Sequence, residues 1–165
     1  MSPPPRPKGE CRSAQPAGAP VTALTPAEVE VLHEALDDEY RAWATYGQVI
    51  ADFGDVPPFS HIRDAEARHI EALATLFARY GLALPPNPWP GRVERYASLQ
   101  QACEAGVAAE IENAQMYERL LPATQQPDVL AVLRRLQEAS QQRHLPAFQR
   151  CAQGGAAGGG CGAGR

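Results

Sequence analysis

The chain has 165 residues, 44% of them hydrophobic, which is enough for one domain with a sizeable core but too few for two. Its 15 Lys and Arg residues and 19 Asp and Glu residues give a formal net charge of -4, without the basic stripe that binding to a phosphate backbone requires. We therefore predict a single globular domain that does not bind nucleic acid.

The first residues of the chain carry positive charge but lack the apolar segment of a signal peptide. Nowhere do about 18 consecutive apolar residues occur, the length that a membrane-spanning helix needs. We therefore expect a soluble, cytoplasmic protein without a membrane partner. The four cysteines form no Cys-x-x-Cys pair, which excludes a rubredoxin-type or zinc-ribbon segment and offers no framework of disulfide bonds.

Both ends of the chain have the composition of disordered tails. Six of the first 20 residues are proline, and seven of the 14 glycines lie between Gly154 and Gly164. We predict tails over 1–23 and 152–165 and a folded domain over 24–151. The domain contains four long helical patterns and no alternation of period two, so the predicted fold class is all-α.

The first helix is predicted to start at a capping box, Thr25-Pro26-Ala27-Glu28, and to end at Phe53. The second is expected to begin after two consecutive prolines and to end near Tyr80, where a glycine can cap it. The connection between these helices is only a few residues long. They are therefore expected to be antiparallel neighbours.

The connection between the second and third helices, residues 81–97, is rich in proline and long enough to travel the length of a bundle. The third helix is predicted over 98–121, with Ser98 and Gln101 forming a second capping box, and the fourth over 127–151. Two helical hairpins joined by one long crossover predict a ferritin-like antiparallel four-helix bundle.

The first and third predicted helices each place a glutamate among apolar residues that repeat three and four positions apart. These glutamates are Glu39 and Glu110. For Glu39, the neighbouring Trp43 and Tyr46 indicate that this face of the helix is buried. Tyr46 and Tyr117 each follow their glutamate by seven residues, which places each tyrosine two turns along the same face. We expect the two phenols to be buried and to hydrogen-bond the opposing carboxylates, not to act in radical chemistry.

The other two helices supply histidines. The second carries Glu66 and His69 at adjacent core-facing positions, which spell Glu-x-x-His and lie on one face because they are three residues apart. The core-facing positions of the fourth helix are Leu133, Leu136, Ser140, His144, Phe148 and Cys151.

An ionised carboxylate buried without a partner costs several kcal/mol, so three glutamates at core positions need an explanation. Carboxylate oxygens and imidazole nitrogens together suit iron, manganese or zinc, and a pair of ions offsets three buried carboxylates. Di-iron bundles take one glutamate from each of two helices and Glu-x-x-His from each of the other two. We therefore predict a dinuclear centre, most simply of two iron ions, whose ligands are Glu39, Glu66, His69, Glu110 and His144.

The fourth helix departs from this pattern, because the expected second Glu-x-x-His begins with Gln141. A glutamine offers only a neutral amide oxygen, so Gln141 is a possible additional ligand of weaker affinity. Pro146 is predicted to kink the helix beside His144, because it removes a backbone hydrogen bond. We therefore expect an asymmetric site with one labile or water-rich metal position.

The segments DEYRAWATY, EARH, EIENAQMY and RHLPAF together resemble the ferritin-like superfamily, and within it bacterial and archaeal rubrerythrin-like domains of unknown function. The resemblance covers about residues 24–151. It implies a carboxylate-bridged dinuclear centre that reacts with dioxygen or peroxide, or that oxidises ferrous iron. Gln141 departs from the rubrerythrin pattern. Without a rubredoxin-like cysteine motif, reductase activity would also need a separate electron donor.

The leading hypothesis is a redox metalloprotein, possible as a monomer or homodimer, in which Glu66 bridges the two ions. Iron oxidation for storage would use the same ligands but needs a large assembly to hold the product. A third hypothesis is a metal-free helical module that binds another protein, with the glutamates held by hydrogen bonds. Cys103 and Cys151 are expected to be small core residues, and Trp89 to cover apolar surface at one end of the bundle.

Overall fold

The computed structural model describes residues 22–156, and over this range all regular structure is helical. The helices are α1 (Pro26–Phe53), α2 (Phe59–Arg79), α3 (Leu99–Leu120), α4 (Pro127–Ala139) and α5 (Leu145–Ala156). A 3-10 turn, Leu121–Ala123, follows α3, and a π-helical segment, Ser140–His144, joins α4 to α5. The all-α prediction is therefore confirmed for these residues. Most of the two predicted tails, residues 1–21 and 157–165, lies outside the described residues, whereas α5 continues five residues beyond the predicted domain end.

The start of α1 is the capping box that the sequence predicts. The backbone N–H of Glu28 donates to the Thr25 hydroxyl (3.3 Å), and the Glu28 carboxylate accepts from the Thr25 backbone N–H (2.9 Å). The box predicted at the start of α3 is only half formed. The Ser98 hydroxyl accepts from the Gln101 N–H (3.2 Å), but the Gln101 side chain accepts from Ala97, one residue earlier than expected (3.2 Å).

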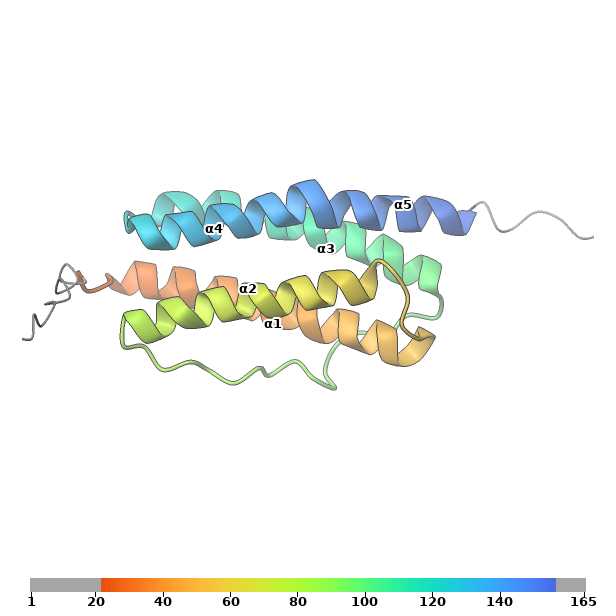
Figure 1. Ribbon diagram of the computed structural model, residues 1–165, viewed down its shortest axis with the longest axis horizontal. Helices are drawn as coiled ribbons and strands as arrows, with labels where there is room; N and C mark the ends of the chain where they lie inside the picture. Colours follow the sequence, from red (N-terminus) through yellow and green to blue (C-terminus); the bar gives the residue numbers. More distant parts are fainter. Residues whose placement is uncertain (1–21, 157–165) are drawn as a thin grey trace, which may run out of the picture.

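Figure 1 shows α1 beside α2, and α3 beside α4 and α5, in an elongated bundle. The chain reverses direction after α1 and again after α3. Between the two pairs, the connection from α2 to α3 runs along the outside of the bundle, so that α3 begins at the end where α1 finishes. None of the helices in the described part is long and apolar enough to cross a membrane.

The long connection is fastened to the middle of α1. The Tyr40 hydroxyl donates to the Pro85 carbonyl (3.0 Å), and the Asn87 side chain donates to the Tyr40 carbonyl (3.3 Å). The Trp89 indole N–H donates to Asp37 (2.9 Å). Trp89 therefore covers apolar surface along the side of α1, and the expectation that it lies at one end of the bundle is wrong.

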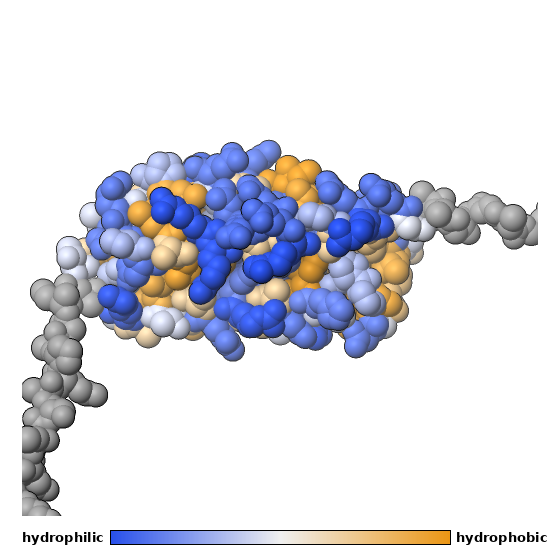
Figure 2. Space-filling view, turned by 45° about the horizontal axis from the view of Figure 1, so that its top comes forward, coloured by the Kyte–Doolittle hydropathy of each residue, from blue (hydrophilic) through white to orange (hydrophobic). Residues whose placement is uncertain are grey.

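The core consists of two apolar clusters separated by a polar layer. One cluster is formed mainly by Leu32, Leu36, Leu73, Leu76, Phe77, Tyr117, Leu120, Val129, Leu133 and Leu136. The other is formed by Tyr46, Val49, Phe59, Ile62, Ala102, Cys103 and Phe148. Between these clusters, α1, α2 and α3 each contribute a buried carboxylate, and the π-helical segment contributes a buried histidine. Figure 2 shows one outer face, which is mostly hydrophilic with scattered hydrophobic areas.

Two expectations about the core are corrected. Trp43 is 36% exposed, and its neighbour Ala44 is buried instead, so Trp43 does not belong to the core-facing side of α1. No framework of disulfide bonds was expected, but Cys103 and Cys151 form a disulfide that joins α3 to α5, with their Cα atoms 5.7 Å apart. The two cysteines are separated by 48 positions in the chain, so their pairing depends on how the helices pack.

Candidate metal centre

The five side chains predicted as metal ligands converge in the polar layer. Glu39, Glu66 and Glu110 are 2–3% exposed, and His144 is 4% exposed. The His69 side chain is less completely buried and is 13% exposed. They come from α1, α2, α3 and the π-helical segment, which surround the layer, and apolar clusters close it along the bundle axis.

Glu66 lies between the two histidines and faces each with one carboxylate oxygen. Its Oε2 is 2.7 Å from Nδ1 of His69, and its Oε1 is 3.2 Å from Nδ1 of His144. Glu39 Oε2 also approaches Nδ1 of His69, at 3.1 Å, and Glu110 Oε2 approaches Nδ1 of His144, at 3.6 Å. Glu39 and Glu110, which each contact one histidine, are the outer carboxylates of this cluster, whereas Glu66 contacts both histidines.

Two buried tyrosines hold the outer carboxylates. The Tyr117 hydroxyl of α3 donates to Oε1 of Glu39 on α1 (2.6 Å), and the Tyr46 hydroxyl of α1 donates to Oε1 of Glu110 on α3 (2.8 Å). The expected hydrogen bonds to opposing carboxylates are therefore present. Burial and the nearby carboxylates raise the pKa of both phenols well above the ordinary value, so both stay protonated as donors.

The π-helical segment decides which residue of the fourth helix faces Glu110. Gln141 is exposed and lies outside the cluster, whereas Ser140 is buried and its hydroxyl donates to Glu110 Oε2 (2.6 Å). At the end of the segment, the Leu145 N–H donates to the Ser140 carbonyl, five residues back instead of four. This wider turn directly precedes Pro146, where the sequence predicted a kink.

Sequence reasoning therefore missed Ser140 as the residue that contacts the cluster. Its position in the core-facing pattern, four residues before His144, was the available signal. The Glu-x-x-His template pointed to Gln141 instead, because that template assumes an unbroken α-helix.

Without a metal ion, the carboxylates of the cluster favour the protonated form of both histidines. Burial lowers the pKa of His69, but hydrogen bonds to Glu39 and Glu66 outweigh it and raise the value to about 9. Burial also lowers the pKa of His144, but contacts with Glu110 and Glu66 outweigh this effect and raise the value to about 10. Burial and the charge of Glu66 raise the pKa of Glu39 to about 7. For Glu66, burial is outweighed by the two histidines, and its pKa is lowered.

One nitrogen in the layer has no hydrogen bond. Nδ1 of His144 is buried, and its contacts with Glu66 and Glu110 lack hydrogen-bond geometry. A buried polar atom without a partner is uncommon in proteins and calls for an ion or a water. Glu66, His69 and His144 each offer a ligand atom, and these three atoms lie within 4.8 Å of one another. The residues present therefore fit a metal ion bound between Glu66 and the histidines.

A pocket of about 420 Å³ opens onto the histidine side of this layer. It is bounded by α2, the π-helical segment and α5, and both His69 and His144 contribute to its wall. Arg68, Arg143 and His61 also line this pocket. Its small apolar lining residues include Ala65 and Ala147. Small molecules can therefore approach the imidazoles through this opening.

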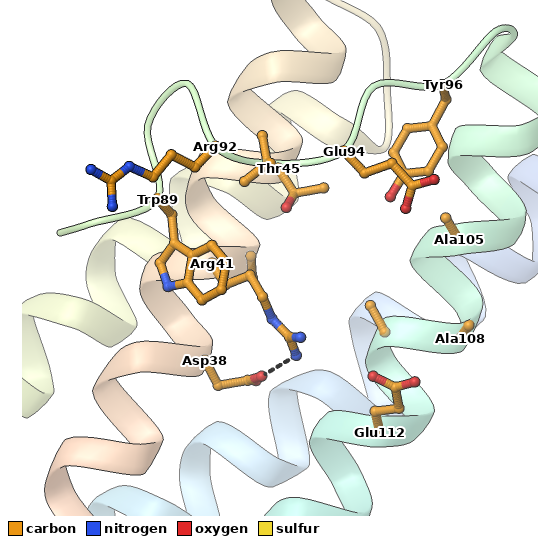
Figure 3. Close-up of a pocket in the computed structure, with 13 residues that line it drawn as sticks. Asp38, Arg41, Thr45, Trp89, Arg92, Glu94, Tyr96, Ala105, Ala108 and Glu112 are labelled. Atoms are coloured by element: carbon orange, nitrogen blue, oxygen red, sulfur yellow. Dashed lines mark hydrogen bonds and ion pairs between the residues drawn. The ribbon is translucent and has the colours of Figure 1, made fainter.

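A second pocket of about 330 Å³, shown in Figure 3, lies on another side, between α1, the long connection and α3. Asp38 and Arg41, which form an ion pair (2.8 Å), line it together with Trp89 and Glu112. None of the five clustered side chains contributes to its wall. This pocket is therefore separate from the polar layer.

No family model matches the chain, and no curated protein sequence matches it. Among solved structures, the chain is similar to the hypothetical protein MJ0754 from Methanococcus jannaschii. The TM-score is 0.75 at 21% identity, over 85% of this chain and 87% of the other. At this level of identity the similarity concerns the fold alone. The chain thus shares its helical fold with an archaeal protein of similar extent.

Proposed function

We propose that this chain is a ferritin-like redox metalloprotein whose polar layer binds a pair of metal ions. The observation that carries the proposal is the position of Glu66, which faces a different histidine with each carboxylate oxygen, at 2.7 and 3.2 Å. A bridging carboxylate between two ions needs this arrangement. Glu39 and His69 would complete one end of the site, and Glu110 and His144 the other.

Iron is the metal that we propose, with manganese or zinc as alternatives that the same ligands accept. Bound iron supplies the ferrous and ferric states needed to reduce dioxygen or peroxide. The protein's own residues supply the rest. Tyr46 and Tyr117 hold the outer carboxylates in place, the apolar clusters exclude water along the axis, and the pocket beside His69 admits the substrate. Electrons would come from a separate donor.

The resemblance of the four ligand-bearing segments to rubrerythrin-like domains supports this proposal. So does the directional order of the helices in Figure 1, two hairpins with one crossover, which is typical of ferritin-like bundles. The proposal departs from the family pattern at one point, because a serine stands where a sixth ligand would be expected. The second ion is therefore expected to bind more weakly than the first.

The test is the metal content of protein purified without chelator, loaded with ferrous iron under anaerobic conditions and then desalted. Wild type is expected to retain between one and two ions per chain, and Glu66→Gln to lose most of them. Glu28→Gln is the matched control, because Glu28 is equally buried but is hydrogen-bonded by Thr25, Thr124 and Gln125. Wild-type retention below about a tenth of an ion per chain would refute the proposal.

A second candidate is a metal-free helical module. It is favoured by the raised pKa values of His69 and His144, about 9 and 10, because two imidazolium ions would neutralise most of the carboxylate charge. The same measurement separates the two candidates. If the folded wild-type protein takes up no iron, manganese or zinc, the metal-free function is the one that remains. For a metal-loaded protein, light scattering separates a redox monomer or homodimer from a storage assembly.

A further inference from the structure

A metal-loaded centre in this layer would have unbalanced charge. Two divalent ions carry four positive charges, whereas Glu39, Glu66 and Glu110 supply three negative ones. His69 and His144 are neutral as metal ligands, and the Ser140 hydroxyl next to Glu110 is neutral as well. The next carboxylate on α1, Asp38, is engaged by Arg41 at 2.8 Å and cannot serve as the missing charge. One positive charge therefore remains in a buried layer, where unpaired charge is costly.

The pocket that leads to this layer has the same sign of charge. Its wall contains three side chains that can be cationic besides the cluster, namely His61, Arg68 and Arg143, and it contains no carboxylate. Both arginines are exposed, and neither has an ion-pair partner among residues 22–156. This local excess of positive charge contrasts with the net charge of -4 of the whole chain. Such a pocket raises the local concentration of anions.

We propose that the loaded centre binds a small monoanion, a carboxylate or a group of similar size and charge. The anion enters through the pocket between Arg68 and Arg143 and replaces the carboxylate that the fourth helix lacks. This inference rests on the metal centre proposed above and names the class of ligand that the centre takes. The π-helical segment supports it, because it places the short, neutral side chain of Ser140, and not a carboxylate, against Glu110.

The test uses the full chain loaded with cobalt(II), whose visible absorption reports changes of coordination. Cobalt content is measured first. The loaded protein is then titrated at constant ionic strength with formate, which mimics the missing carboxylate, and with formamide, its neutral counterpart. Formate is expected to change the spectrum saturably, and formamide is expected to leave it unchanged. Raising the salt concentration should weaken the formate response by screening the pocket.

Three variants and one control sharpen the result. Arg68→Gln and Arg143→Gln are each expected to weaken formate binding about threefold to tenfold, the effect of one unit charge removed from a partly solvated site. Arg134→Gln is the matched control, because Arg134 is an exposed arginine of α4 that does not line the pocket. Ser140→Glu should retain cobalt and lose the formate response, because its own carboxylate fills the position. If circular dichroism shows that Ser140→Glu does not fold, the two arginine variants decide alone.

The possible failures are distinguishable. Folded wild type that retains no cobalt would refute the metal centre and this inference with it. Protein that retains cobalt but does not respond to formate would refute the anion site alone. An equal response to formamide would also refute the anion site. So would Arg68→Gln and Arg143→Gln proteins that bind formate with the same affinity as the Arg134→Gln control.

Discussion

Replacing Gly106 by alanine tests how closely α3 and α5 pack beside the polar layer. A Cβ atom at Gly106 would lie 2.6 Å from Cδ1 of Phe148 and 2.8 Å from its Cγ and Cε1. The ring cannot retreat easily, because it is fully buried and packs on Tyr46 and Phe59 at centroid separations of 5.1 Å. The substitution therefore forces either the ring or the helix to move.

The expected loss of stability follows from two opposing effects. In a helix interior, alanine is about 1 kcal/mol more favourable than glycine. Overpacking a tight core costs about 1–3 kcal/mol, and the overlap with three ring carbons puts Gly106→Ala at the upper end of that range. The net prediction is destabilisation by about 1–2 kcal/mol. For a chain of this length it corresponds to a decrease in Tm of about 2–8 °C.

The assay is thermal and urea unfolding followed by circular dichroism, with Gly47→Ala as the control. Gly47 also lies inside a helix, but its added Cβ would meet only the side chain of Arg63, at 4.0 Å. Gly47→Ala is therefore expected to be stabilised by about 0.5–1 kcal/mol. The two substitutions should change stability in opposite directions. A Gly106→Ala protein as stable as wild type would refute the close approach of α3 to Phe148.

Three further predictions concern the site and its supports. Ser140→Glu should bring the iron content closer to two ions per chain, whereas Gln141→Glu should leave it at the wild-type value. Equal iron contents of the two variants by elemental analysis would contradict the finding that Ser140, and not Gln141, faces the cluster. Tyr117→Phe should destabilise the metal-free protein by about 2 kcal/mol in urea unfolding, because a buried carboxylate loses its donor, and the half-buried Tyr80→Phe should have less effect. Backbone N–H groups, the Thr25 amide foremost, lower the pKa of Glu28 to about 2. The stability that ionised Glu28 contributes to the fold is therefore fully present above about pH 4.5 and is lost as the pH falls toward 2. Wild type and Glu28→Gln should therefore have similar unfolding free energies near pH 2.

The residues of the site were predictable because the α-helical repeat determines which side chains share a face. Glu39 and Glu110, each with a tyrosine seven residues later, needed nothing beyond this periodicity, and the observed hydrogen bonds of Tyr46 and Tyr117 follow from it. On the fourth helix the same repeat placed Ser140 on the core-facing side, where it donates to Glu110. The Glu-x-x-His template selected Gln141 instead, because it assumes a regular α-helix where the chain forms a π-helical turn.

Other errors have different physical origins. Trp43 and Ala44 are adjacent, and hydrophobicity alone favours burying the larger side chain, but the helix turns Ala44 inward and leaves Trp43 at 36% exposure. The position of Trp89 depends on its hydrogen bond to Asp37, a contact between residues 52 positions apart that no local pattern predicts. The pairing of Cys103 with Cys151 likewise depends on tertiary packing.

The π-helical segment has a consequence for how the length of this chain can vary. Removing one residue from an α-helix rotates everything after it by about 100°, which turns a core-facing side away from the core. Ser140–His144 already contains the additional residue of a wider turn, so a deletion there would restore an α-helix with α4 and α5 still facing inward. The regular helix would then have to accept Pro146 in its interior, at a cost of about 3 kcal/mol. The additional residue is therefore what accommodates this proline, and a homologue lacking both would be expected to keep the same fold.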